Sequence, residues 1–247
     1  MRRLLQLLLF YLMLLWLGAM LLLGNAACVP LVLAPRRWRE PLLQRLISAV
    51  FRIFLAGCEA CGLMRLDLRA LDALDGERGG LLLVANHPSM IDVFLVVSRL
   101  RRVLCLMKAS VAANAFLAVG ARLAGYIANR NGVQLLREAT RAARAGQRLL
   151  VFPEGTRTAH APLDPLKPGV GLIAKRGGVP LQLVVLHSNS SYLAKGWPIW
   201  RPPRFPLCYQ ARLGPRLHAT TSVDDTMRRL RAAFERELAA QPDAPGG

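Results

Sequence analysis

The chain has 247 residues, of which 53% are hydrophobic, and carries a formal net charge of +18. This length suffices for one α/β domain with a sizeable core plus an appendage, and the positive charge suits nucleic acid, an anionic membrane surface or an anionic substrate. Five scattered cysteines argue against a disulfide scaffold and indicate a reducing compartment, and no basic run interleaved with aromatic residues marks a nucleic-acid surface.

The first 66 residues are predicted to form membrane-anchoring helices. Residues 4–23 are uncharged and almost entirely apolar, and a helix of that length matches a hydrocarbon core of about 30 Å. The alternative is a cleaved signal peptide, for which the apolar run is too long and no small-x-small cleavage site follows. Gly24, Asn25 and Pro30 can break the helix, so the segment either spans the bilayer or enters it and returns.

A second apolar segment follows at residues 41–66. The segment carries an apolar helical stripe, which either covers the core of the main domain or lies in the membrane interface. The stripe consists of Leu42, Leu46, Ala49, Val50, Ile53, Leu55 and Ala56. The two interpretations are compatible. Basic residues are denser after the first segment, at positions 36, 37 and 39, than before it. This asymmetry favours a main domain on the cytoplasmic side of the membrane.

From residue 67 onward the chain alternates strand-like and helix-like segments. Short apolar runs predict strands, and longer periodic segments predict helices. A strand and a turn are expected between residues 66 and 80. Further strands are expected from residue 81 and at 103–107, 126–128, 149–152, 181–186 and 207–213, and helices at 109–124, 133–145, 168–176 and from 222. This alternation predicts an α/β domain over residues 67–241 with a largely parallel central sheet and helices on both faces, followed by a disordered tail at 242–247.

A candidate acid–base pair stands at the end of the strand that begins at residue 81. His87 follows the apolar run directly, where a rigid scaffold can hold a reactive group, and a neutral imidazole can accept a proton. Asp92 comes five residues later, which on an ideal helix is about 140° away from His87 around the axis. The two side chains can therefore meet only if His87 lies on a loop and Asp92 in the first turn of a helix. The alternative is a chance pairing without function.

A candidate anion site follows the strand at 149–152. Gly155 permits a tight turn whose N–H groups can face an anion, and the planar guanidinium of Arg157 suits phosphate. The alternative is a turn held by a pair between Glu154 and Arg157. Lys108 and Arg130 each follow a predicted strand, and they either add positive charge to the same crevice or are simply exposed.

Together these segments resemble the glycerolipid acyltransferase family. Residues 86–92 look like its N-H-x-x-x-x-D block, and residues 152–158 resemble its F-P-E-G-T-R-[ST] block. Residues 125–130 are similar to the intervening block that ends in arginine, although Asn129 stands where many members have aspartate. The N-terminal segments also resemble the membrane helices of bacterial 1-acylglycerol-3-phosphate acyltransferases.

The resemblance implies direct acyl transfer from acyl-CoA or acyl-carrier protein to the hydroxyl of a lysophospholipid, above all 1-acylglycerol-3-phosphate, which would give phosphatidic acid. His87 would be the base and Asp92 its partner. Contacts to the acceptor would come from Glu154, Gly155, Thr156, Arg157, Arg130 and Lys108. Neither a metal nor a cofactor is expected, and membrane lipids rather than nucleic acid are the expected surroundings.

Two alternatives stay open at this point. The acceptor could be another lysolipid, such as a lyso-aminolipid or a glycolipid. A more distant alternative is a non-catalytic, basic membrane protein that binds lipid or nucleic acid. Residues 191–203 match no block of the family, and they either shape the acceptor pocket or place Trp197 and Trp200 in the membrane interface.

Overall fold

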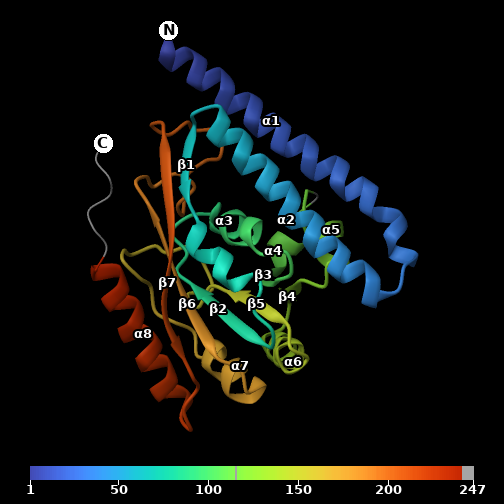
Figure 1. Cartoon of the computed structure of the whole chain (residues 1–247), viewed down its shortest axis with the longest axis vertical. Coiled ribbons are helices and arrows are strands. Elements are labelled where there is room, and N and C mark those ends of the chain that lie inside the picture. Colours follow the sequence, from blue (N-terminus) through green and yellow to red (C-terminus); the bar gives the residue numbers. More distant parts are fainter. Residues whose placement is uncertain (115, 241–247) are drawn as a thin grey trace.

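A seven-stranded sheet runs through the centre of the computed structural model, which describes residues 1–114 and 116–240. Its strand order is β1–β7–β6–β2–β5–β3–β4 (Figure 1). The strands are β1 (Met64–Asp67), β2 (Leu81–Ala85), β3 (Leu104–Lys108), β4 (Ile127–Asn129), β5 (Arg148–Val151), β6 (Leu181–Ser188) and β7 (Leu207–Leu217). The predicted tail at 242–247 lies outside the described residues.

The sheet is parallel except at one junction. Among the described residues only β6 and β7 pair antiparallel, so β7 and its parallel neighbour β1 run against the other five strands. The central strand β2 is buried along its whole length, as expected for a strand of a parallel sheet that is covered on both faces. The predicted largely parallel α/β fold is therefore confirmed.

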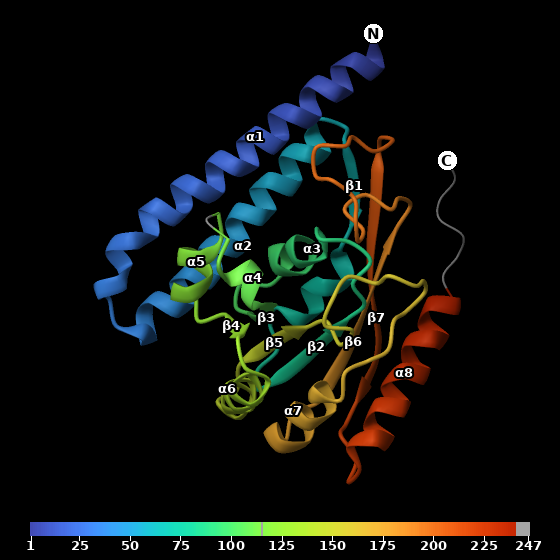
Figure 2. The same cartoon turned by 180° about the vertical axis from the view of Figure 1, so that it is seen from behind.

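Helices cover both faces of the sheet (Figures 1 and 2). One layer contains α1 (Arg2–Cys28), α2 (Arg36–Ala60), α3 (Asp92–Arg99), α4 (Ala109–Ala112) and α5 (Ala118–Leu123), and the other contains α6 (Gly132–Arg144), α7 (Gly169–Gly177) and α8 (Val223–Ala239). Along β2 the side chains alternate between the two cores. Leu81 and Leu83 pack towards α2 and α3, whereas Leu82 and Val84 pack towards the layer of α6 to α8.

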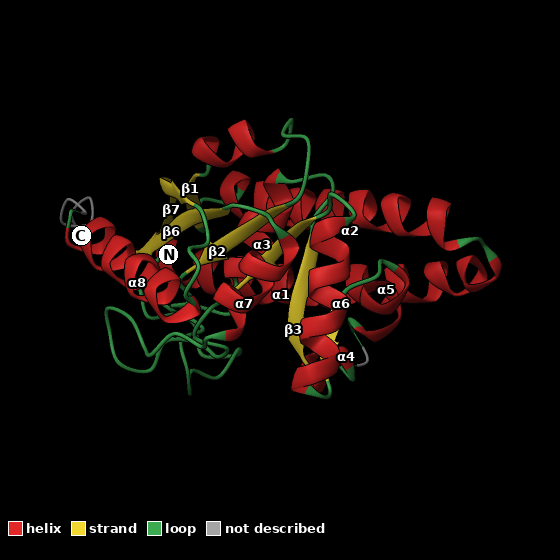
Figure 3. Ribbon diagram, turned by 90° about the horizontal axis from the view of Figure 1, so that it is seen from below, coloured by secondary structure: helices red, strands yellow, loops and turns green. Residues whose placement is uncertain are grey.

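The two N-terminal helices form a hairpin along the outside of the domain (Figures 1 and 3). Helix α1 continues past Gly24 and Asn25, and Pro30 lies in the short 3-10 helix η1 (Val29–Leu33) that leads into α2. Trp16 of α1 lies directly over Gly57 of α2, where a Cβ would come within 2.7 Å of the indole ring. By length and composition, residues 2–33 and 36–60 are each able to cross a membrane, a test that a core helix or a signal sequence also passes.

Helix α2 buries only part of the apolar stripe seen in the sequence. It begins at Arg36 rather than at Pro41, and its buried face carries Leu43, Phe51 and Phe54. The ring of Phe51 stacks on that of Phe94 in α3, with centroids 4.0 Å apart. Of the predicted stripe, Leu42, Leu46 and Ile53 are exposed, whereas Leu55 is buried and Val50 packs against the core. The helix is apolar on two faces, so the pattern could not identify the face that meets the core.

Two other segments differ from their predicted form. The predicted helix at 109–124 is divided into α4 and α5, because the chain leaves the helical path near Asn114, whose side-chain oxygen accepts a hydrogen bond from the N–H of Phe116. Asparagine favours such local bonds over a continuing helix. The predicted strand and turn between residues 66 and 80 consist of the end of β1 followed by the 3-10 helix η2 (Arg69–Leu74).

Candidate active site

His87 and Asp92 meet at the carboxyl end of β2. The Nδ1 atom of His87 lies 2.9 Å from Oδ2 of Asp92, and the backbone N–H of Ser89 donates to the same oxygen at 2.7 Å. His87 lies on the loop, and Asp92 is the first residue of α3, which is the arrangement that the spacing required. With its Nδ1 proton donated to the carboxylate, a neutral imidazole keeps the lone pair of Nε2 as a proton acceptor.

The surroundings of Asp92 prepare it to stabilise a positive charge on His87. Burial raises the pKa of Asp92 above its ordinary range, while the hydrogen bond from His87 acts in the opposite direction. Burial destabilises the negative charge of a carboxylate, and a positive charge on a neighbouring group stabilises it again. The first turn of α3 favours a negative charge as well. Asp92 can therefore orient the imidazole and stabilise its protonated form.

The turn after β5 fixes the position of His87. The ring of Phe152 stacks on the imidazole with centroids 3.9 Å apart, and the N–H of Thr158 donates to the carbonyl of His87 at 2.8 Å. Strands β2 and β5 are paired neighbours, with Val84 opposite Val151, so both segments leave the sheet at the same edge. The structure thus brings together the two sequence blocks, as expected for a parallel sheet.

Glu154 occupies an internal position in this turn. Its side chain is buried, and its carboxylate accepts hydrogen bonds from the N–H of His87 at 3.1 Å, the hydroxyl of Thr158 at 3.0 Å and the N–H of Asp164 at 3.0 Å. Glu154 was expected among the contacts to the acceptor. In the structure it joins three backbone segments beside His87, and its negative charge would repel a phosphate.

Arg157 connects the turn to the segment that follows β6. Its Nη1 donates to the carbonyls of Leu193 at 2.9 Å and Ala194 at 3.0 Å. Gly155 adopts φ +69°, which confirms the expected tight turn, and Thr156 beside it is partly exposed. The proposed phosphate contact of Arg157 stays a prediction for the guanidinium nitrogens that do not hold these carbonyls.

Lys108 and Arg130 lie at the same edge of the sheet but further along it. Lys108 ends β3 and Arg130 follows β4, two and three strands from β2 in the sheet order, which corresponds to roughly 10 and 14 Å at the usual strand spacing. Both side chains are exposed. They add positive charge to the edge that carries His87 without contacting the histidine.

Asn86 holds the end of β2 to β6, a role that the sequence did not reveal. Its side-chain amide donates to the carbonyl of Leu186 at 2.9 Å, and its side-chain oxygen accepts from the N–H of the same residue at 2.7 Å. The amide therefore replaces a peptide group in the sheet ladder. In the sequence, the one signal for this role was that Asn86 directly precedes the candidate base His87.

The segment after β6 covers the His87 loop. Ser89 donates its hydroxyl to the carbonyl of Tyr192 at 2.8 Å, and the N–H of Met90 donates to the carbonyl of Leu193 at 3.1 Å. Phe10 of α1 packs edge-on against the ring of Tyr192 at 5.9 Å. The segment at residues 191–203 therefore joins the N-terminal hairpin to the histidine loop.

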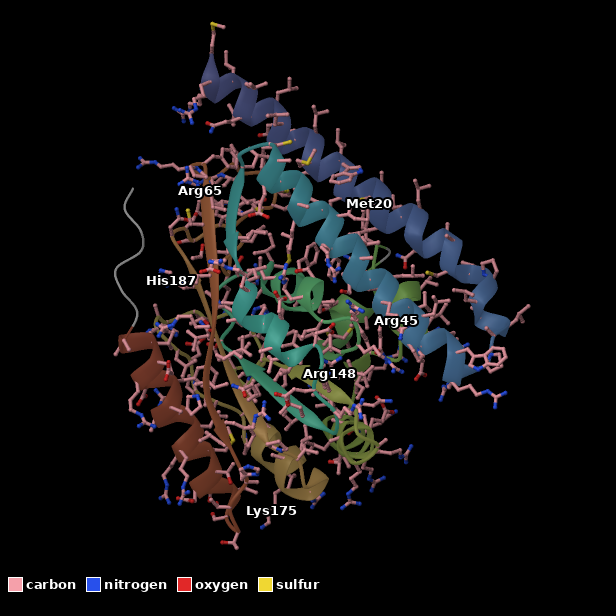
Figure 4. All side chains as sticks on the ribbon, viewed as in Figure 1. Met20, Arg45, Arg65, Arg148, Lys175 and His187 are labelled. Atoms are coloured by element: carbon pink, nitrogen blue, oxygen red, sulfur yellow. The ribbon has the colours of Figure 1, made fainter. Side chains whose placement is uncertain are left out.

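His187, labelled beside β7 in Figure 4, has a buried Nε2 without a partner among the described residues.

Comparison with known proteins identifies the family of this site. The sequence profile of the acyltransferase family matches residues 68–187, a range that contains both blocks of the site. Residues 68–187 therefore match the acyltransferase family. The expected family membership is thereby confirmed, and the paired His87 and Asp92 of this acyltransferase domain occupy the N-H-x-x-x-x-D block.

Two known proteins resemble this chain, one in sequence and one in fold. A chloroplastic 1-acyl-sn-glycerol-3-phosphate acyltransferase of Brassica napus is 24% identical over 135 residues, which are 53% of this chain and 39% of the plant protein. The chain thus matches about two fifths of the length of that relative. The crystal structure of the 1-acyl-sn-glycerophosphate acyltransferase PlsC from Thermotoga maritima superposes with a TM-score of 0.68 at 18% identity, covering 98% of each chain. The folds therefore agree over their whole length, N-terminal hairpin included.

Proposed function

We propose that this protein is an O-acyltransferase that moves a fatty acyl group from acyl-CoA or acyl-carrier protein to the free hydroxyl of 1-acylglycerol-3-phosphate, giving phosphatidic acid. The observation that carries the proposal is the 2.9 Å contact between His87 and Asp92. This pair lies at the same edge of the sheet as the turn that contains Glu154. The names of the plant relative and of the Thermotoga structure, both acyltransferases for this acceptor, support the choice of substrate.

The proposed reaction is one direct transfer. Nε2 of His87 takes the proton of the acceptor hydroxyl while the oxygen attacks the thioester carbonyl, and Asp92 stabilises the resulting imidazolium. The tetrahedral intermediate collapses with cleavage of the carbon–sulfur bond, and the imidazolium returns its proton to the leaving thiolate. The atoms balance without a covalent enzyme intermediate, and this step requires no metal or cofactor besides the thioester donor.

The predicted contacts to the acceptor phosphate stay part of the proposal. Arg157, Lys108 and Arg130 supply the positive charge of the same sheet edge, and Gly155 and Thr156 supply the turn whose N–H groups can face an anion. Glu154 contributes by holding these segments beside His87 rather than by touching phosphate.

We also propose that the hairpin of α1 and α2 holds the domain at the cytoplasmic side of a bacterial inner membrane. Leu8, Leu12 and Leu15 lie on one exposed face of α1, and Trp38 and Trp200 are exposed as well. Such an apolar face with interfacial tryptophans suits a bilayer surface. Both substrates carry acyl chains, so a site beside the membrane shortens the path of the lipid to His87.

A panel of acceptors tests the proposed substrate. The purified protein is incubated with one labelled acyl thioester and, in turn, lysophosphatidic acid, lysophosphatidylethanolamine, a lyso-aminolipid and a lyso-glycolipid. We expect the highest kcat/KM with lysophosphatidic acid. A higher value with an acceptor that lacks a terminal phosphate would assign the enzyme to another lysolipid, and acyl transfer to none of them would contradict the proposed function.

A further inference from the structure

Lys167 folds its side chain back over the turn that follows β5. A Cβ built on Gly155 would lie 2.7 Å from both Cε and Nζ of Lys167 and 2.9 Å from its Cδ. A Cβ at position 155 would therefore require the flexible end of the Lys167 side chain to move, and it would also be strained at φ +69°. The ammonium group of this exposed side chain thus lies close to the turn.

Backbone hydrogen bonds hold the segment that carries Lys167 against the same turn. The N–H of Lys167 donates to the carbonyl of Pro153 at 2.8 Å, and the N–H of Asp164 donates to the carboxylate of Glu154 at 3.0 Å. The same carboxylate accepts the N–H of His87. Lys167 therefore belongs to the hydrogen-bonded unit that positions the candidate base.

The charge of Lys167 is not neutralised within the part of the chain that the structure describes. No carboxylate there forms an ion pair with its Nζ, and the oxygens of Glu154 already accept three other donors. The backbone N–H groups of Thr156 and Arg157 likewise have no acceptor among these residues. Adjacent free N–H groups with a cation beside them form a typical binding site for an anion.

We infer that Lys167, with the N–H groups of Thr156 and Arg157, binds the phosphate of the acceptor lipid. This inference rests on the proposed function, because that function supplies the phosphate. It adds a cation that the sequence motifs did not suggest, at a turn whose arginine is partly committed to the carbonyls of Leu193 and Ala194. Lysine is suited to this role as a compact point charge with three donors.

Steady-state kinetics with two acceptors test the role of Lys167. Lysophosphatidic acid carries the phosphate, whereas monoacylglycerol, measured as a substrate or as a competitive inhibitor, has the same chain and hydroxyl without it. We expect Lys167→Gln to raise KM for lysophosphatidic acid about tenfold or more, the effect of losing one hydrogen bond to a charged group. The kcat value and the constant for monoacylglycerol should stay within about twofold, and Lys167→Arg should recover part of the affinity.

A second lysine variant controls for the loss of charge, and a glycine variant displaces the side chain of Lys167. Lys175→Gln removes the same charge from α7, where Lys175 donates to the carbonyl of Thr221, and should leave KM unchanged (Figure 4). Gly155→Ala, which displaces the side chain of Lys167, should raise KM for lysophosphatidic acid in the same direction. Thermal unfolding of each variant shows whether it is folded.

The outcomes separate this inference from the proposed function. Unchanged KM for lysophosphatidic acid in folded Lys167→Gln, an equal rise for both acceptors, or the same rise in Lys175→Gln would overturn the role of Lys167 and leave the acyltransferase intact. A wild-type protein that acylates no phosphate-bearing lysolipid would overturn both.

Discussion

Neighbouring residues fix the position of His87 and determine which of its ring nitrogens carries the proton. Asp92 accepts from Nδ1 at 2.9 Å, Phe152 stacks on the ring, and Glu154 accepts the backbone N–H. Of these residues, only Asp92 is positioned to respond to a charge on the imidazole, because its carboxylate contacts the ring nitrogen and lies in the first turn of α3. In the proposed reaction His87 is therefore the base, and Asp92 is the partner that stabilises its charge.

Replacement of Asp92 by asparagine tests this assignment. The amide keeps the shape but loses the charge and does not require Nδ1 to be the protonated nitrogen, so we expect kcat to fall by about 10²-fold or more with little change in KM. Asp225→Asn, which removes a carboxylate from the first turn of α8, serves as the control and should keep wild-type kinetics. A folded Asp92→Asn enzyme with normal kcat would show that the carboxylate has no part in the reaction.

At the scale of the elements, helix α2 is both a cover of the core and part of the outer surface. Phe51 is 4% exposed and stacks on Phe94, whereas Ile53, two residues further along, is 53% exposed. These two residues therefore report separately on packing and on the outer face. The core-covering interpretation of this segment is therefore confirmed for one side of the helix, and the membrane-interface interpretation stays a prediction for the other.

A pair of truncations on α2 tests this division. We expect Phe51→Ala to lower the free energy of unfolding by about 3 kcal/mol, because it leaves a cavity between α2 and α3. Ile53→Ala should change it by less than about 0.5 kcal/mol, as is usual for a surface position. Denaturant unfolding in detergent measures both, and equal effects of the two substitutions would contradict the observed packing.

The sequence predicted the elements better than their contacts. Apolar runs located the strands, and the end of the strand at Ala85 together with the spacing of His87 and Asp92 located the pair, because these features are local. The buried face of α2 could not be predicted, since both of its faces are apolar. The bonds of Asn86 to Leu186 and the fold of Lys167 over Gly155 join positions far apart in the chain, which no local pattern encodes.

At the scale of the whole molecule, the apolar hairpin lies on the opposite side of the sheet from the layer of α6 to α8 (Figures 1 and 2). The exposed leucines of α1 mark one outer face. A second, basic face is offered by Arg137, Arg141 and Arg144 on α6, all of which are exposed. A membrane-bound domain would turn the first face to the bilayer, and the second would stay in water.

Vesicle binding distinguishes these two faces. Replacing Leu8, Leu12 and Leu15 together by serine should weaken co-sedimentation with lipid vesicles about tenfold, since three leucines contribute roughly 1–2 kcal/mol of insertion free energy. Replacing the three α6 arginines by serine should have a smaller effect. If the arginine variant alone lost vesicle binding, the basic face would be the membrane contact instead.

The most direct test of the account is acyl transfer by wild-type protein, His87→Ala and His160→Ala, each incubated with lysophosphatidic acid and a labelled acyl thioester. His160 is a matched control, because its Nδ1 also lies 3.0 Å from an aspartate oxygen, that of Asp164, on an exposed loop. We predict labelled phosphatidic acid from wild type, a kcat lowered by about 10²-fold or more in His87→Ala, and near-normal kcat in His160→Ala. Near-normal turnover by a folded His87→Ala protein would contradict the central claim that His87 is the base.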